Sequence, residues 1–177
     1  MTGEAGAGAA APLICVMGVS AAGKSTVGIA LATALGVSFE DADPLHSEAN
    51  RAKMNAGTPL TDDDRWSWLD AVGGRFAAHE HDGLVLACSA LRRVYRDRIR
   101  AVAPEVLFVH LHGSRELLGS RADARTGHFM PPALLDSQLA TLEELEPDEA
   151  GIVVVVDKTP DEIVREILDR LGEASTR

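Results

Sequence analysis

The segment that most constrains this chain is Gly18-Val-Ser-Ala-Ala-Gly-Lys-Ser25, which matches the phosphate-binding pattern G-x-x-x-x-G-K-[ST]. Its two glycines allow a tight backbone turn, so that successive N–H groups can point inward at phosphate oxygens. Lys24 supplies a positive charge for the outer phosphates, and Ser25 supplies a hydroxyl for a magnesium ion. The segment therefore predicts a P-loop. The alternative is an ordinary glycine turn that happens to be followed by a lysine, which the motif by itself does not exclude.

The flanking sequence favours the P-loop. Leu13–Met17 is an apolar run of strand length directly before the loop, and Thr26–Leu35 directly after it has the composition of a helix that Gly36 would end. A helix in this position directs its positive dipole end at bound phosphates.

Five apolar runs alternate with helical segments, which predicts the α/β class with a five-stranded parallel sheet covered on both faces. The expected strands are Leu13–Met17, Val37–Glu40, Leu84–Cys88, Val106–Leu111 and Ile152–Val156. Helices are expected at 26–35, 47–54, 61–79, 93–103, 114–125, 133–144 and 160–171. Ligands of such sheets bind beyond the carboxyl ends of the strands, so the residues that follow each strand are the candidates for function.

Composition narrows the range of partners. The 177 residues carry a formal net charge of −10, which argues against a nucleic-acid or anionic-membrane surface but not against a small anionic substrate. No apolar stretch reaches transmembrane length. Cys15 and Cys88 form no C-x-x-C and are expected to be reduced, buried thiols of a cytoplasmic protein. Residues 1–12 are predicted to be a disordered Ala/Gly-rich tail, and residues 13–177 a single domain.

Two carboxylates follow the second expected strand. Asp41 and Asp43 would face the same way if the segment stayed extended. One could orient the water shell of a magnesium ion, and the other could accept a proton from an attacking hydroxyl. The alternative is a structural role in a turn or helix cap before Pro44.

Basic side chains supply two further candidates. Arg121 and Arg125 lie four residues apart at the edge of a glycine-containing loop, where a lid could bring them over nucleotide phosphates. The alternative is a solvated helix face. Arg65 follows three aspartates that suit the first turn of a helix, and it is a possible clamp for an anion.

The segments considered together resemble the gluconokinase family. The resemblance rests on Met17–Ser25, Asp41-Ala-Asp-Pro-Leu-His46, Asn50, Lys53-Met54, Gly57-Thr-Pro-Leu-Thr-Asp-Asp-Asp-Arg65, Trp68-Leu69, Ala87-Cys-Ser-Ala-Leu-Arg-Arg93, Tyr95-Arg-Asp97 and Gly127-His-Phe-Met130. It extends from about Leu13 to about Leu171. The P-loop indicates only a nucleotide, whereas the Asp-Asp-Asp-Arg, Cys-Ser-Ala-Leu and Gly-His-Phe segments are far more specific.

The resemblance implies a fold like that of shikimate kinase and the nucleoside monophosphate kinases, with a lid at about residues 121–132 and a small helical substrate-binding region. It implies that the γ-phosphoryl group of ATP is transferred, with Mg²⁺, to the 6-hydroxyl of D-gluconate. It also implies a cytoplasmic homodimer that has neither a nucleic-acid nor a membrane partner.

The resemblance also implies roles for individual residues. ATP is expected at Gly18, Val19, Ser20, Ala21, Ala22, Gly23, Lys24, Ser25 and Thr26, with Arg121 and Arg125 from the lid. The acceptor is expected at Asp43, His46, Arg65, Ser89 and Arg93. Lys24, Asp43 and Arg125 are the expected catalytic residues, with Asp43 as the base. Ser25 and Asp41 are assigned to the metal, because no aspartate ends the Leu84–Cys88 strand.

The chain departs from the family at two places. One is the missing aspartate at the end of the Leu84–Cys88 strand, and the other is Ala21, where family members often carry glycine. A methyl group there should be tolerated if the backbone at Ala21 is not left-handed.

Two rival functions remain open at this stage. One is a kinase of the same fold that acts on shikimate or a nucleoside monophosphate. The other is a module that binds ATP and signals through a partner without chemistry. Dependence of ATP turnover on an added sugar acid would distinguish phosphorylation of gluconate from both rivals.

Overall fold

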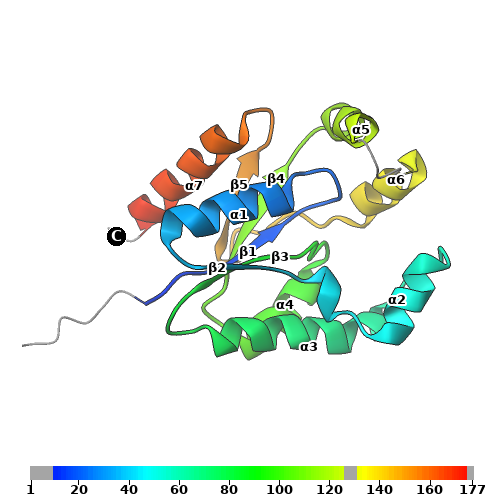
Figure 1. The fold of residues 1–177 in the computed structure, drawn as a ribbon, viewed down its shortest axis with the longest axis horizontal. Coiled ribbons are helices and arrows are strands. Elements are labelled where there is room, and N and C mark those ends of the chain that lie inside the picture. The colour runs from blue at the N-terminus through cyan, green and yellow to red at the C-terminus, as the bar shows by residue number, and fades with distance from the viewer. Residues whose placement is uncertain (1–9, 126–130, 175–177) are drawn as a thin grey trace, which may run out of the picture.

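A computed structural model describes residues 10–125 and 131–174. Its centre is an all-parallel sheet with strand order β2-β3-β1-β4-β5 (Figure 1). The strands are β1 (Leu13–Met17), β2 (Ser38–Asp41), β3 (Leu84–Ala87), β4 (Leu107–His112) and β5 (Gly151–Val155). The predicted five-stranded parallel sheet is therefore confirmed. Residues 1–9 of the predicted tail and 126–130 of the predicted lid lie outside the described residues.

Helices cover both faces of the sheet. On one face lie α1 (Lys24–Leu35) and α7 (Pro160–Ala174), and on the other lie α3 (Asp62–Ala78) and α4 (Arg93–Val102) (Figure 1). The shorter helices α2 (Glu48–Asn55), α5 (Arg115–Ala124) and α6 (Pro132–Thr141) lie near the end of the sheet where the P-loop leaves β1, as does the 3₁₀ turn η1 (Asp43–Leu45).

The pleat of β1 shows why its sequence is apolar throughout. Ile14 and Val16 point into the core under α1 and α7, whereas Leu13, Cys15 and Met17 point into the core under α3 and α4. Each of these five side chains is at most 7% exposed. A strand that is covered on both faces has no solvent side, so its pattern is continuous rather than alternating. Cys15 and Cys88 are both buried and free, as expected.

Strand register brings the expected functional segments together. Asp41, at the end of β2, pairs with Ala87 at the end of β3. The backbone N–H of Ala42 donates to the carbonyl of Ala87 at 2.9 Å, and that of Cys88 donates to the carbonyl of Val16 at 3.1 Å. The chain therefore leaves β1, β2 and β3 at one shared edge.

Several element boundaries differ from those expected. Helix α1 begins at Lys24 rather than Thr26, and α6 ends at Thr141 rather than near Glu144. The early end of α6 is caused by a contact with a distant segment, because the N–H of Glu143 donates to the carbonyl of Leu91 at 2.7 Å instead of continuing the helical ladder.

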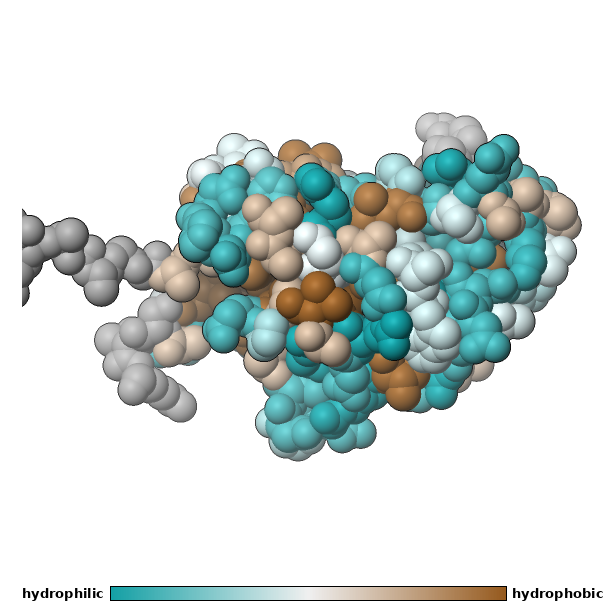
Figure 2. Space-filling model, turned by 90° about the horizontal axis from the view of Figure 1, so that it is seen from below, coloured by the Kyte–Doolittle hydropathy of each residue, from teal (hydrophilic) through white to brown (hydrophobic). Residues whose placement is uncertain are grey.

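The face that carries α3 and α4 is largely hydrophilic, with isolated apolar residues (Figure 2). Within residues 10–125 and 131–174, none of the helices combines the length and the apolar character that crossing a bilayer requires.

Candidate active site

The loop between β1 and α1 has the conformation that its glycines allow. Gly18 and Gly23 have φ values of 146° and 90°, and a Cβ atom on Gly18 would lie 2.9 Å from the carbonyl oxygen of Leu111. Ala21 also lies in the left-handed region, with φ 65°. The condition for tolerating its methyl group without strain is therefore not met, and this alanine holds a conformation that costs on the order of 1 kcal/mol.

Lys24 lies at the first turn of α1, and its side chain folds back over the loop. Its Nζ donates to the carbonyl oxygen of Val19 at 3.0 Å. Burial lowers the pKa of Lys24, and the nearby carboxylates of Asp43 and Asp41 oppose that shift. The side chain thus lies within electrostatic reach of both aspartates.

Asp41 connects the P-loop helix to the end of β2. Its Oδ2 accepts a hydrogen bond from the Ser25 hydroxyl at 3.1 Å, and its Oδ1 accepts one from the backbone N–H of Asp43 at 2.9 Å. The pairing of a hydroxyl with a carboxylate is the hard-oxygen donor set that Mg²⁺ prefers. No group of three or more His, Cys, Asp or Glu side chains suited to a metal occurs among the described residues, so most ligands of such an ion would have to be phosphate and water oxygens.

Asp43 begins η1, so the backbone is not extended between the two aspartates. Asp43 is exposed. Burial raises the pKa of Asp43, the Asp41 carboxylate raises it further, and Lys24 opposes the shift. A carboxylate with a raised pKa is a better proton acceptor than an ordinary aspartate.

His46 follows η1 and stacks on Trp68 of α3, with ring centroids 4.1 Å apart and an interplanar angle of 13°. Burial lowers the pKa of His46, and the positive charges of Arg65 and Arg51 lower it further, so the imidazole is neutral at pH 7. The Nε1 of Trp68 donates to the carbonyl of Ala42 at 2.8 Å. This bond holds the segment that carries both aspartates against α3.

Arg65 and Arg92 flank the ring of Tyr95, with guanidinium carbons 5.5 Å and 5.6 Å from its centroid. Arg92 is paired with Asp62, whose other carboxylate oxygen accepts from the Tyr95 hydroxyl. Among the described residues, the side chain of Arg65 makes one long hydrogen bond, at 3.4 Å, to the carbonyl of Leu60, and it forms no ion pair with a carboxylate. Arg65 therefore retains hydrogen-bonding capacity for an anion.

The segment after β3 carries Ser89 and Arg93 in different environments. The carbonyl of Ser89 accepts from the N–H of Gly18 at 3.3 Å, so it lies against the start of the P-loop. Arg93 was expected at the acceptor site, but its guanidinium forms a bidentate pair with Asp148 and also contacts Glu146. The structure thus places Ser89 beside the P-loop and Arg93 in a separate ionic cluster.

Arg121 and Arg125, at the end of α5, line a cavity of about 300 Å³ beside the P-loop. Its remaining walls come from the P-loop, α1 and the start of α7, namely Ala21, Ala22, Gly23, Thr26, Val27, Lys158, Pro160 and Ile163. A guanidinium N–H of Arg121 donates to the carbonyl of Val156. The cavity is large enough for part of a nucleotide and adjoins the loop that would hold the phosphates.

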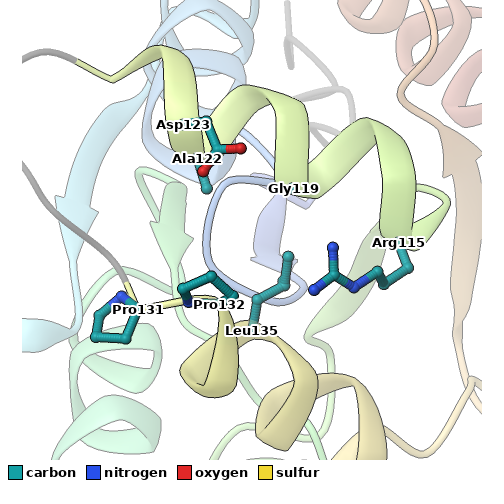
Figure 3. A pocket seen from close by; sticks show the side chains of 7 residues that line it. All are labelled: Arg115, Gly119, Ala122, Asp123, Pro131, Pro132 and Leu135. Carbon is teal, nitrogen blue, oxygen red and sulfur yellow. The ribbon is translucent and has the colours of Figure 1, made fainter.

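A second cavity lies between α5 and α6, where Arg115 and Leu135 point into it (Figure 3). Its volume is about 90 Å³, which is well below the roughly 300 Å³ of small ligand sites. It is lined by Arg115, Gly119, Ala122, Asp123, Pro131, Pro132 and Leu135.

A buried ion pair beneath the site was not identified from the sequence. Arg96 is 0% exposed, and its Nε and Nη2 donate to Glu149 at 2.7 Å and 2.9 Å. It also donates to the carbonyls of Ala90, Glu143 and Glu144. Ala90 has φ 43° and follows Ser89 directly. Arg96 thus holds the turn after β3 against the segment that follows α6.

Two further contacts at the site, those of Arg92 with Asp62 and of Gln138 with the P-loop, were not predicted from the sequence. The Oε1 of Gln138 accepts from the backbone N–H of Ser20 in the P-loop at 2.6 Å. No local pattern could have indicated it, because the two residues are 118 positions apart.

Comparison with known proteins agrees with this geometry. Residues 20–172 match the shikimate kinase family. The chain is 46% identical to a gluconokinase of Gluconobacter oxydans, over 88% of each protein, and 41% identical to the thermoresistant gluconokinase of Escherichia coli, over 79% and 81%. A crystal structure of a gluconokinase from Sinorhizobium meliloti superposes with a TM-score of 0.85 at 49% identity, over 93% and 95% of the two chains. An APS kinase of Mycobacterium tuberculosis shares the fold alone, with a TM-score of 0.65 at 19% identity. The chain belongs to the gluconokinase family of P-loop kinases.

Proposed function

We propose that this protein transfers the γ-phosphoryl group of ATP to the 6-hydroxyl of D-gluconate, which yields 6-phospho-D-gluconate and ADP. The observation that carries the proposal is the convergence of Lys24, the Ser25–Asp41 pair and Asp43 at one edge of the sheet. Membership of the gluconokinase family supplies the acceptor.

ATP binds along the P-loop in this proposal. Residues 18–26 surround the phosphates with backbone N–H groups, and Lys24 adds its charge there. Arg121 and Arg125 border the adjoining cavity of about 300 Å³. One arginine lies near the adenine, and the other neutralises charge on the group in transfer.

Ser25 and Asp41 are the proposed residues for Mg²⁺. Their oxygens are 3.1 Å apart and suit this ion. When bound, magnesium offsets negative charge on the phosphate oxygens. Asp41 also holds the backbone N–H of Asp43, so the same carboxylate positions the proposed base.

The acceptor occupies the side of the site formed by α3, η1 and the segment after β3. Arg65, which forms no ion pair with any described carboxylate, binds the carboxylate of gluconate through its guanidinium. The neutral imidazole of His46 and the Ser89 hydroxyl can each donate to and accept from sugar hydroxyls. Since Arg93 is held by Asp148 and Glu146, we assign it to fixing that segment rather than to a contact with gluconate.

Proton transfer falls to Asp43. Its carboxylate accepts the proton of the 6-hydroxyl as that oxygen attacks the γ-phosphorus in line. Lys24 and Arg125 stabilise charge on the transferred group, and closure of the lid around the acceptor excludes water that would otherwise hydrolyse ATP.

The test is ADP release from ATP and Mg²⁺ with D-gluconate, shikimate, AMP or no acceptor. We expect turnover with gluconate and only a background rate otherwise. Turnover with shikimate or AMP instead would contradict the acceptor assignment. ATP binding without turnover on any acceptor would favour a nucleotide-sensing module.

We also propose that the protein is a cytoplasmic homodimer, which the resemblance to gluconokinases supports. Light scattering on the purified protein should give a mass twice that of the 18.7 kDa chain. A mass equal to that of one chain at micromolar concentration would contradict the dimer.

A further inference from the structure

The peptide unit between Val19 and Ser20 is held on both of its sides. Its carbonyl oxygen accepts from the Nζ of Lys24 at 3.0 Å, and its N–H donates to the Oε1 of Gln138 at 2.6 Å. These two groups belong to one planar peptide, so neither can turn without the other. The orientation of this P-loop peptide therefore depends on a side chain of α6.

Gln138 is well placed to act as a fixed anchor. It is the single glutamine of the chain and is partly buried in the last turn of α6. Its own carbonyl accepts from the N–H of Leu142, and the next N–H, that of Glu143, donates to Leu91. The end of the helix that carries Gln138 is thus joined by a hydrogen bond to the turn after β3, which restricts its movement.

We propose that Gln138 is a positioning residue that orients Lys24 through the Val19–Ser20 peptide, an inference that rests on the proposed ATP site. An ammonium group has three donors. One of them is directed to the carbonyl of Val19, which leaves two for phosphate oxygens. If the peptide rotated, Lys24 would lose the bond that sets the direction of the other two.

Two physical effects strengthen this dependence. A peptide whose N–H is bonded is polarised, so its carbonyl becomes a stronger acceptor for Lys24. Lys24 is also partly buried, so its ammonium depends more on the protein oxygens that surround it. A neutral glutamine serves here because a carboxylate at this position would oppose incoming phosphates.

The test is a double-mutant cycle on the affinity for ATP, measured by calorimetry without an acceptor. The four proteins are the wild type, Gln138→Met, Lys24→Met and the double variant. Methionine keeps the length of the side chain but removes the acceptor oxygen. We expect Gln138→Met to weaken ATP binding about three- to tenfold, the value of one net hydrogen bond, when Lys24 is present. In the Lys24→Met background we expect no further change.

Equal weakening in both backgrounds, or no weakening when Lys24 is present, would overturn the proposal. Ser137→Ala, at an exposed neighbouring position of α6, is the matched control and should bind ATP as the wild type does. If Gln138→Met does not fold, Gln138→Asn replaces it, since one methylene fewer removes the 2.6 Å contact. Because ATP binding is measured without an acceptor, the result of the cycle can be interpreted even if the acceptor is not gluconate. Wild-type ATP binding without gluconate turnover would refute the proposed function alone.

Discussion

The nucleotide side and the acceptor side of this site are built in different ways. The phosphate-binding part of the nucleotide side is one contiguous segment, in which Lys24 contacts a carbonyl five positions earlier and Gln138 adds a single contact from a distant helix. The acceptor side is assembled from η1, α3, the turn after β3 and the segment after α6. There, Arg96 bonds to Glu149 across 53 positions.

The two sides should therefore respond differently to substitution. The P-loop binds through the shape of its backbone, so substitutions there should affect ATP binding and turnover more than folding. The acceptor side depends on buried charge pairs between distant segments, so its defects should affect folding first. The predictions below test that separation, from the largest expected effect to the smallest.

The largest effect is expected for Arg96→Met. It leaves the buried carboxylate of Glu149 with only Arg100 as a charged partner and frees the carbonyls of Ala90 and Glu143. We expect a loss of about 3–5 kcal/mol in the free energy of unfolding, measured in urea. Arg98→Met is the control on the same helix, because its exposed pair with Asp70 should be worth at most about 1 kcal/mol. Similar losses for both variants would contradict a supporting role of the buried pair.

Lys24→Met should lower turnover and leave stability nearly unchanged, which is the reverse of the effect expected for Arg96→Met. We expect turnover to fall by about a hundredfold or more, because a charge directed at the transferred group is lost. Unfolding in urea should change little, since the side chain makes one hydrogen bond to the loop. Turnover near the wild-type level would remove Lys24 from the mechanism. A large loss of stability would remove the contrast between the two sides.

His110 lies in β4, where the charge of Arg96 reaches it, so its titration tests the structure that supports the acceptor side. Burial, and then the charges of His112 and Arg96, lower its pKa from 6.5 to about 4. Between pH 6.5 and about pH 4, His110 therefore binds a proton in the unfolded chain but not in the folded one. As the pH drops below 6.5, protonation of the unfolded state lowers the free energy of unfolding. Between pH 7 and pH 5 the wild type should lose about 2 kcal/mol more than His110→Leu. Parallel pH profiles of unfolding for the two proteins would contradict this.

The smallest effect is expected at Ala21. Glycine there removes the cost of a methyl group at φ 65° but makes the unfolded chain more flexible. We expect a net gain of at most about 1 kcal/mol in the free energy of unfolding. Ala22→Gly is the control, because Ala22 is buried and lacks a positive φ, so it should lose stability. Destabilisation by Ala21→Gly would show that the strain at Ala21 is smaller than the entropic cost of a glycine there.

Sequence predicted the features that depend on local pattern. The five strands follow from apolar runs, and the positions of Asp41 and Asp43 follow from the rule that ligands bind at strand ends. The boundaries of α6 and the partners of Arg93, Arg96 and Gln138 did not follow. Each depends on contacts between segments that are far apart in the chain, which no periodicity encodes. The left-handed conformation of Ala21 could not be predicted from the sequence either, because φ at one residue is set by the packing of the whole loop.

The most direct test of the central claim is identification of the product by ³¹P and ¹³C NMR after incubation with ATP, Mg²⁺ and D-gluconate. We expect one new phosphate ester resonance, coupled to C6 of gluconate, which grows in step with ADP. With Lys24→Met, this resonance should be absent on the same timescale. Phosphate attached to another carbon, or inorganic phosphate released in its place, would contradict the proposed transfer.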